Sequence, residues 1–316
     1  METPGPYDVA IIGAGPGGTT AAIYAARSNL RTLLIDKVHL GGQMVFTEKI
    51  ANYPGCPEPV SGRELLDSMR RQAESYGAEF LVSEVMGLDL EGDPKSVHCY
   101  HGVFQARAVI IAAGAGERKA KVPGEEEFLG RGVSYCATCD GPFFKGEEVA
   151  VVGESAEAAE EALFLSRFAG TVHILTPKSG LQGADHLADE IAGQPQIVIH
   201  PHKRVKRVIG EATVTGLECQ VRDTPVEVLP VVGAFFYLLG AQPATSFLRG
   251  ALELDEKGYV RVDETMMASV PGVYAVGDVR RGVLKQVVTA AADGAVAAMA
   301  AERYIRGRST IIKTPH

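Results

Sequence analysis

The chain has 316 residues, of which 46% are hydrophobic and 22% charged, and its formal net charge is −8. This composition is that of a globular protein with one large or two ordinary domains, and it excludes a fibre or a disordered tail. No apolar run approaches a membrane span, and the net negative charge argues against nucleic-acid binding. The largest basic run, residues 202–207, is expected to be a solvated strand edge rather than a docking patch. Because no signal peptide is recognisable, the sequence predicts a cytoplasmic protein.

The N-terminal segment predicts a dinucleotide-binding site. An apolar strand over residues 7–12 leads into the glycine sequence of residues 13–18, and the following residues have helical composition. In such a motif Gly13 permits the tight turn, Gly15 lets the backbone approach a pyrophosphate, and Gly18 allows close packing of helix against strand. The helix N-terminus then offers N–H donors to the phosphates.

A second strand, over residues 31–35, ends at Asp36, whose carboxylate can accept a hydrogen bond from a ribose hydroxyl. Further along, an alternating run over residues 97–104 predicts a hairpin strand. The cluster of His98, Cys99 and His101 within that run is therefore expected to be structural rather than a metal site.

The segment Cys136-Ala-Thr-Cys139-Asp140 predicts a redox-active dithiol. Two thiols at this spacing can close into a reversible disulfide, and one of them has a lowered pKa. The other three cysteines are single and complete no tetrahedral zinc set, so we expect dithiol exchange and no metal. The carboxylate of Asp140 could supply or take protons; the alternative is a turn residue before Gly141.

Residues 269–278 predict an apolar strand that ends in Gly277-Asp278, and this ending favours FAD as the dinucleotide. Asp278 would hydrogen-bond to the ribitol chain. A helix that begins near Gln286 would direct its N-terminus at the flavin ring and stabilise negative charge there. Together with the N-terminal glycine motif, this segment predicts an FAD site.

The order and spacing of these motifs resemble those of the low-molecular-weight thioredoxin reductases, from about residue 7 to residue 304. The motifs that carry the resemblance are Gly13 to Gly18, Gly41-Gly42-Gln43, Asn52-Tyr53-Pro54-Gly55, Cys136 to Gly141, and Gly277-Asp278 followed by Lys285-Gln286-Val287-Val288. The resemblance implies an α/β fold with two Rossmann-like, three-layer ββα domains. The FAD domain, residues 1–116 and 246–316, would be interrupted by a smaller disulfide-bearing domain, residues 117–245. The resemblance also implies a homodimer.

The resemblance further implies the roles of individual residues. Cys139 would face the flavin, Cys136 would attack the disulfide of thioredoxin, and Asp140 would exchange protons. The expected FAD-binding residues are Gly13, Gly15, Pro16, Gly18, Asp36, Gly42, Gln43, Asn52, Ala113, Gly114, Gly277, Asp278, Lys285, Gln286 and Val287.

One segment departs from the family. A strand over residues 148–153 should open an NADPH site, but Ser155 stands where the family has the glycine that a pyrophosphate approaches. Glu154 and Glu157 add carboxylates at a helix N-terminus that would otherwise attract phosphates.

The cations for the 2′-phosphate of NADPH are also missing. After the strand over residues 171–175 the family has a His-Arg-Arg run and a later arginine, whereas this chain has Thr176-Pro177-Lys178 and then Gln182. No acidic residue ends the strand, as an NADH site would require. The sequence thus predicts no nicotinamide site, with a weakened NADPH site as the alternative. The closing segment of the domain, residues 234–245, is retained.

Without NADPH the flavin needs another reductant, and we expect ferredoxin, because the chain resembles the ferredoxin-dependent flavin thioredoxin reductases in lacking the NADPH motif. A plant-type ferredoxin near roughly −400 mV can reduce thioredoxin near roughly −270 mV. Two other functions stay open, a dithiol oxidase that uses oxygen and a flavin-bound redox sensor without turnover. The tail, residues 306–316, is expected either to fold over the flavin through Ile311, Ile312 and His316 or to be disordered.

Overall fold

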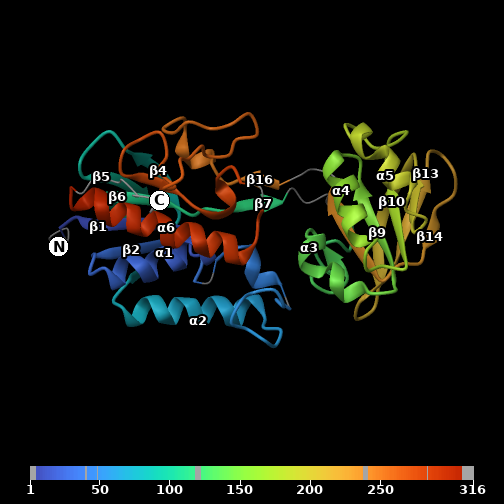
Figure 1. Cartoon of the computed structure of the whole chain (residues 1–316), viewed down its shortest axis with the longest axis horizontal. Coiled ribbons are helices and arrows are strands. Elements are labelled where there is room, and N and C mark those ends of the chain that lie inside the picture. Colours follow the sequence, from blue (N-terminus) through green and yellow to red (C-terminus); the bar gives the residue numbers. More distant parts are fainter. Residues whose placement is uncertain are drawn as a thin grey trace, which may run out of the picture. The chain divides into compact units, whose positions relative to one another are not determined.

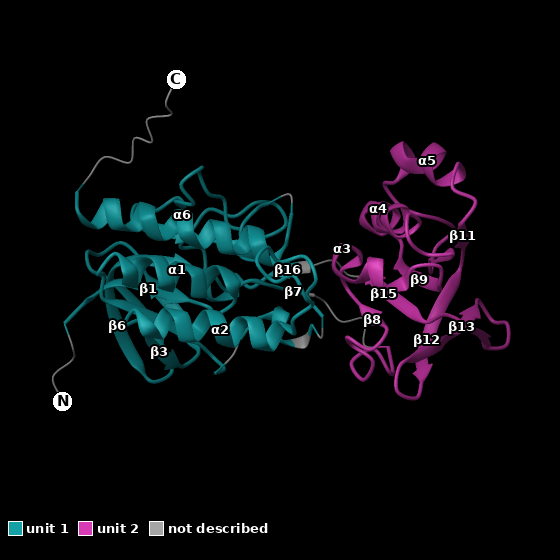
Figure 2. Ribbon diagram, turned by 60° about the horizontal axis from the view of Figure 1, so that its bottom comes forward, with its two compact units in different colours: residues 1–116, 242–316 teal, residues 117–241 magenta. Residues whose placement is uncertain are grey.

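A computed structural model describes residues 5–39, 41–47, 49–117, 122–237, 241–282 and 284–307. The chain forms two compact units (Figure 2). Unit 1 consists of Met1–Gly116 and Gln242–His316, and unit 2 of Glu117–Ala241. The predicted contacts of Ile311, Ile312 and His316 lie outside the described residues.

Unit 1 is built on a seven-stranded sheet in the order β3-β2-β1-β6-β5-β4, with β17 paired to β6 (Figure 1). The strands are β1 (Tyr7–Ile12), β2 (Thr32–Asp36), β3 (Glu79–Val82), β4 (Val85–Asp89), β5 (Lys95–Cys99), β6 (Gly102–Ile111) and β17 (Val273–Ala275). The pairs of β1 with β2 and β6, of β2 with β3, and of β17 with β6 are parallel, whereas β4, β5 and β6 pair antiparallel. The apolar side chains of β1 and β2 are buried, as strands that are covered on both faces require.

Three helices cover this sheet: α1 (Pro16–Arg27), α2 (Gly62–Ser75) and α6 (Val287–Ile305). Helices α1 and α6 lie side by side (Figure 1). They approach closely because a Cβ atom at Gly294 would lie 2.1 Å from the carbonyl oxygen of Gly17, so only glycine fits there. Helix α2 begins with a capping box, in which Ser61 and Glu64 satisfy each other's backbone amides.

Unit 2 contains a five-stranded parallel sheet in the order β11-β10-β9-β15-β8 and a three-stranded antiparallel sheet, β12-β13-β14. The strands are β8 (Val133–Ser134), β9 (Glu148–Gly153), β10 (Thr171–Leu175), β11 (Ile197–His200), β12 (Lys203–Gly210), β13 (Val214–Val221), β14 (Glu227–Leu229) and β15 (Gly233–Tyr237). Its helices are α3 (Ala137–Asp140), α4 (Ala156–Leu165) and α5 (Ala188–Ala192). One apolar cluster joins the two sheets through Val152, Leu175, Val208 and Leu217, and another packs α4 on the opposite face. The predicted α/β fold with Rossmann-like parallel sheets is confirmed.

Short elements complete the chain. Strands β7 (Ala115–Glu117) and β16 (Ala241–Pro243) pair with each other where the chain passes between the units. The 3₁₀ turns are η1 (Gln43–Phe46), η2 (Gly141–Phe144), η3 (Asp185–Leu187), η4 (Ser246–Leu248) and η5 (Gly277–Val279). Among the described residues, no helix has both the length and the apolar character that a membrane crossing needs.

The structure refines three sequence-based elements. The run over residues 97–104 contains the ends of two strands, because the chain reverses before Gly102, whose φ of 136° favours glycine. The strand expected over residues 269–278 is shorter, since Gly272 makes a turn with φ of 77° and β17 begins only at Val273. In the closing segment, residues 234–245, strand β15 ends at Tyr237 and residues 238–240 lie outside the described part of the chain.

Candidate active site

The first glycine turn in unit 1 has the shape that a pyrophosphate requires. Gly13 has a φ of 105°, and a Cβ there would lie 2.3 Å from the carbonyl oxygen of Ala112. A Cβ at Gly18 would lie 1.8 Å from the carbonyl oxygen of Gly13, whereas a Cβ at Gly15 would meet no atom within 4 Å. Close contacts within the chain thus require glycine at positions 13 and 18, whereas Gly15 faces open space.

The start of helix α1 is free to bind an anion. Gly15 is the N-cap and Pro16 is at the first helical position, and no side chain caps the helix. The first-turn N–H groups have no intrahelical partner, so they can donate to phosphate oxygens. This uncapped N-terminus and the open space at Gly15 fit the pyrophosphate of FAD.

The other predicted residues of the N-terminal half gather around this turn. The Asp36 carboxylate accepts hydrogen bonds from the amides of Ala14 (2.6 Å) and Val38 (3.2 Å), which hold it at the end of β2. A Cβ at Gly42 would lie 3.3 Å from the Cα of Gly15, and one at Gly13 would lie 3.1 Å from the Cα of Ala113. Gly114 follows Ala113 with a φ of 72° and accepts a hydrogen bond from the Ala244 amide (3.0 Å). Gln43 begins η1 directly after Gly42.

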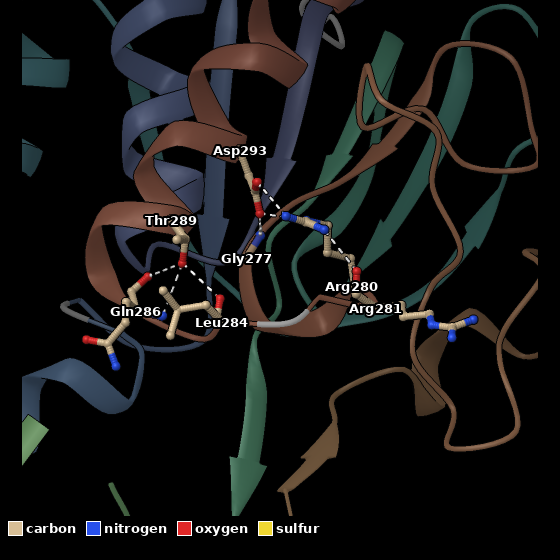
Figure 3. A network of polar contacts seen from close by, with 7 residues as sticks. All are labelled: Gly277, Arg280, Arg281, Leu284, Gln286, Thr289 and Asp293. Atoms are coloured by element: carbon tan, nitrogen blue, oxygen red, sulfur yellow. Dashed lines mark hydrogen bonds and ion pairs between the residues drawn. The ribbon is translucent and has the colours of Figure 1, made fainter. Parts of the chain in front are cut away.

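Asp278 lies in the turn η5. An ion pair between Arg280 and Asp293 holds the end of this turn against helix α6 (Figure 3). The Asp293 carboxylate accepts hydrogen bonds from the Gly277 amide (3.0 Å) and from Nε (2.6 Å) and Nη2 (2.7 Å) of Arg280. Burial raises the pKa of Asp278, and the nearby Lys285 ammonium opposes that rise. Sequence analysis missed Arg280 and Asp293. The available signal was an acidic residue in the alanine-rich part of a helix, where a buried carboxylate requires a partner.

The N-terminus of α6 brings together residues that are far apart in sequence. Gln286 is the N-cap of this helix. Its backbone amide donates to the hydroxyl of Thr289 (3.1 Å), and that hydroxyl donates to the carbonyl of Leu284 (3.0 Å) (Figure 3). The side-chain amide of Asn52 donates to Oε1 of Gln286 (3.0 Å). Val287 is the first residue of the helix. Lys285 donates to the hydroxyl of Tyr259 (2.6 Å) and lies 4.2 Å from the centroid of its ring.

The dithiol lies at the start of helix α3 in unit 2. Cys136 and Cys139 form a disulfide, and Cys136 is the N-cap, since its sulfur accepts a hydrogen bond from the Cys139 amide (3.2 Å). The Ser134 hydroxyl accepts from the Cys136 amide (3.0 Å), and the Tyr237 hydroxyl accepts from the Ala137 amide (2.8 Å). These two hydroxyls hold the backbone around the sulfur atoms, and no motif in the sequence pointed to either of them.

Asp140 follows Cys139 directly in the chain and is the last residue of α3, so its carboxyl is a candidate proton carrier. Burial raises the pKa of Asp140, although a hydrogen bond with Ser134 opposes the shift. Cys99 and Cys219 are not suited to thiolate chemistry, because burial raises the pKa of both thiols to about 11. Thiolate reactivity requires a low pKa.

The second glycine turn, after β9, differs from the first in its polar contacts. Ser155 is the N-cap of α4, and its hydroxyl accepts a hydrogen bond from the Ala158 amide (3.3 Å). Glu154 forms an ion pair with Lys178 (2.7 Å), and its carbonyl accepts from the Gln182 amide (2.6 Å). The predicted departures at residues 154, 155, 178 and 182 therefore gather at one end of the sheet and contact one another.

A dinucleotide turn with an acidic flavin-type turn in one unit, and a Cys-x-x-Cys disulfide in the other, define the class of flavin-dependent disulfide oxidoreductases. Residues 7–294 match the family model of pyridine nucleotide-disulphide oxidoreductases, and the chain belongs to this family. It is 44% identical over 308 residues to a thioredoxin reductase of Aquifex aeolicus, with 97% of this chain and 95% of that protein covered.

Solved structures agree with this assignment. A thioredoxin reductase from Streptococcus pyogenes is 37% identical with a TM-score of 0.93, and the match covers 96% of this chain and 100% of that one. A ferredoxin-flavin thioredoxin reductase from Clostridium acetobutylicum is 30% identical with a TM-score of 0.52, covering 96% and 98%. The predicted enzyme class and the FAD cofactor are confirmed. The assignment to the ferredoxin-dependent subgroup is not supported, because ordinary thioredoxin reductases show higher identity.

Proposed function

We propose that this protein reduces the disulfide of thioredoxin through the Cys136–Cys139 pair. The observation that carries the proposal is the disulfide at the start of α3, with the half-buried Asp140 on the same turn, in a chain of the flavin-dependent family. When bound, FAD supplies the two electrons that convert the disulfide to a dithiol, a step that also consumes two protons. Because its pKa is raised, the Asp140 carboxyl holds a proton at a higher pH than an exposed aspartate does.

The two cysteines then act in sequence on the partner. The thiolate of Cys136 attacks one sulfur of the thioredoxin disulfide, which forms a mixed disulfide and releases the other partner sulfur as a thiolate. Cys139 then attacks Cys136, which restores the disulfide and frees the second partner sulfur. We assign the proton transfers in these steps to Asp140, whose carboxyl has a raised pKa. Reduced enzyme should therefore lose its electrons rapidly to oxidised thioredoxin, and Cys136→Ser should prevent that reaction in an anaerobic stopped-flow experiment.

Two electron donors are candidates. NADPH is the first candidate, because a relative from Arabidopsis thaliana, 38% identical over 315 residues, is called an NADPH-dependent thioredoxin reductase. A one-electron protein donor such as ferredoxin is the second candidate, and the contacts at the start of α4 favour it. Ser155 caps an amide that a pyrophosphate would need, and Glu154 pairs with Lys178. In contrast, the start of α1 has no side-chain cap.

An anaerobic titration distinguishes these donors. The flavin absorbance would be followed while NADPH, NADH and photoreduced ferredoxin are added in turn. Rapid bleaching by NADPH would support NADPH as the donor and contradict ferredoxin. Bleaching by ferredoxin alone would support ferredoxin and contradict NADPH. In the variant Ser155→Gly we expect tighter NADPH binding, because the amide of Ala158 becomes available to phosphate.

The same protein sample tests two other functions. A dithiol oxidase would form hydrogen peroxide from dithiols in air faster than it reduces thioredoxin. A redox sensor would show no steady-state turnover with any donor. We also propose that the protein is a homodimer, which predicts twice the chain mass of 33.5 kDa in light scattering, and that it works in the cytoplasm.

A further inference from the structure

Glu161 on helix α4 has a carboxyl group that no cation compensates. The residue is half-buried, and its Oε2 atom is buried with no hydrogen-bond partner among the described residues. In the same part of the chain, Glu161 forms no ion pair either. Buried polar atoms in folded proteins normally have a partner, so this exception calls for a physical explanation.

Helix α4 lies against the elements that carry the dithiol. It packs on α3, and one apolar cluster joins Ala158 of α4 with Ala137 of α3 and Tyr237 of β15 (Figure 2). Tyr237 approaches α4 closely because Gly153 has no side chain. A Cβ at Gly153 would lie 2.8 Å from the Cβ of Ala158 and 3.2 Å from that of Tyr237. The Tyr237 side chain therefore extends from the end of β9 to the start of α3.

The Tyr237 hydroxyl connects Glu161 to the dithiol helix. It accepts a hydrogen bond from the backbone amide of Ala137 (2.8 Å), the residue that follows Cys136. Because the oxygen accepts from this amide, the hydroxyl donates its own hydrogen in another direction. The carboxyl of Glu161 is close enough to the hydroxyl for the contact to lower the pKa of Glu161. Groups linked in this way polarise one another.

The charge of Glu161 changes near neutral pH. Burial and the neighbouring Glu157 carboxylate raise its pKa to about 7, Glu160 adds a smaller rise, and Tyr237 opposes the shift. Elements packed against α4 bring other titratable groups, and among the described residues none of them has a comparable effect: Asp140 on α3, Glu148 on β9, His173 on β10, Asp185 and His186 on η3, and Asp189 and Glu190 on α5. Thiols of a redox pair titrate in the same pH range.

We propose that Glu161 is a positioning residue of the dithiol, whose charge acts on the Cys136 thiolate through the Tyr237 hydroxyl and the Ala137 amide. An ionised Glu161 brings a second negative charge near the thiolate and disfavours it, whereas a neutral Glu161 does not. The two titrations are thereby coupled, which broadens the pH dependence of thiolate reactivity across neutral pH. The inference rests on the proposed function in taking Cys136 as the attacking thiol.

Alkylation of the reduced, FAD-loaded protein by iodoacetamide tests the proposal. The rate at Cys136 would be followed by tandem mass spectrometry from about pH 5 to about pH 10, and we expect an inflection near pH 7 in the unmodified chain. Glu161→Gln keeps the size of the side chain and cannot ionise, so the inflection should disappear and the rate at about pH 8 should rise about threefold. In Tyr237→Phe the inflection should move to higher pH, because the hydroxyl that lowers the pKa of Glu161 is lost.

Glu160→Gln is the matched control, because Glu160 is the exposed neighbour of Glu161 on α4 and affects its pKa least. Its profile should keep the inflection. The same comparison in the Asp140→Asn background removes the titration of the other half-buried carboxyl beside the dithiol.

A Glu161→Gln profile that superimposes on that of the unmodified chain, or an equal change in Glu160→Gln, overturns the proposal. If Glu161→Gln does not fold, Tyr237→Phe decides, and an inflection that stays in place overturns the proposal. Alkylation involves no thioredoxin. Failure of the reduced enzyme to react with thioredoxin would therefore contradict the proposed function and leave the alkylation result intact.

Discussion

Removal of the Asp293 carboxylate should loosen the turn that carries Asp278. Asp293 is 7% exposed, and it accepts two hydrogen bonds from the Arg280 guanidinium and one from the Gly277 amide. Loss of one partner from a buried ion pair costs about 3–5 kcal/mol, because the remaining charge is left uncompensated. The Arg280 side chain keeps 21% exposure, so solvent can compensate part of its charge. We therefore expect Asp293→Ala to lower the free energy of unfolding of unit 1 by about 3 kcal/mol.

Equilibrium unfolding in urea, followed by flavin fluorescence, measures the free energy of unfolding of unit 1, the unit with the predicted FAD site. The exposed pair of Asp67 and Arg71 on α2 provides the control, and Asp67→Ala should cost less than about 1 kcal/mol. In a double-mutant cycle, Arg280→Leu with Asp293→Leu should cost less than the sum of the single changes, since neither charge is then left alone. A loss in Asp293→Ala no larger than that in Asp67→Ala would refute the reasoning.

Three further predictions concern the two glycines, the proton carrier and the pH dependence of stability. Gly13→Ala should destabilise the apoprotein by more than about 1 kcal/mol, because Gly13 has a φ of 105° and a Cβ there would strike Ala112. In contrast, Gly15→Ala should leave the stability of the apoprotein unchanged and weaken FAD binding, because a Cβ there meets no atom of the chain. Thermal melts of the apoprotein and titration with FAD would separate the two effects. Asp140→Asn should slow electron transfer from reduced enzyme to thioredoxin by about 10²-fold or more and remove a titration from its pH profile; an unchanged rate would assign Asp140 to the turn alone. Burial, with Lys203 and His173 nearby, lowers the pKa of His200 to about 4. An unfolded histidine has a pKa near about 6.5, so below that pH the unfolded state binds a proton that the folded state does not. The free energy of unfolding should therefore fall by about 1–2 kcal/mol between pH 6.5 and about pH 4, after allowance for solvent screening. Urea unfolding of His200→Gln should lack this fall.

Local motifs made much of the molecule predictable. The strands over residues 148–153 and 171–175 were predicted with the bounds that the structure shows, because continuous apolar runs between glycine and polar residues specify buried parallel strands. The glycines at positions 13, 15 and 18 were predicted from their spacing after an apolar strand, although the atom that a Cβ at Gly13 would strike belongs to Ala112, on a distant segment. Chain reversals near Gly102 and Gly272 were not resolved in the apolar patterns, because the runs continue through the turns.

The sequence by itself determined the α/β class, the flavin turn and the redox-active cysteines, because each depends on residues that are neighbours along the chain. Only the tertiary structure decided which side chains support them. Asp293 reaches Arg280 from helix α6, and Tyr237 reaches the dithiol helix from a strand 100 residues away. Such contacts depend on strand order and register, and a shift of one residue in a strand turns its side chains to the other face of the sheet.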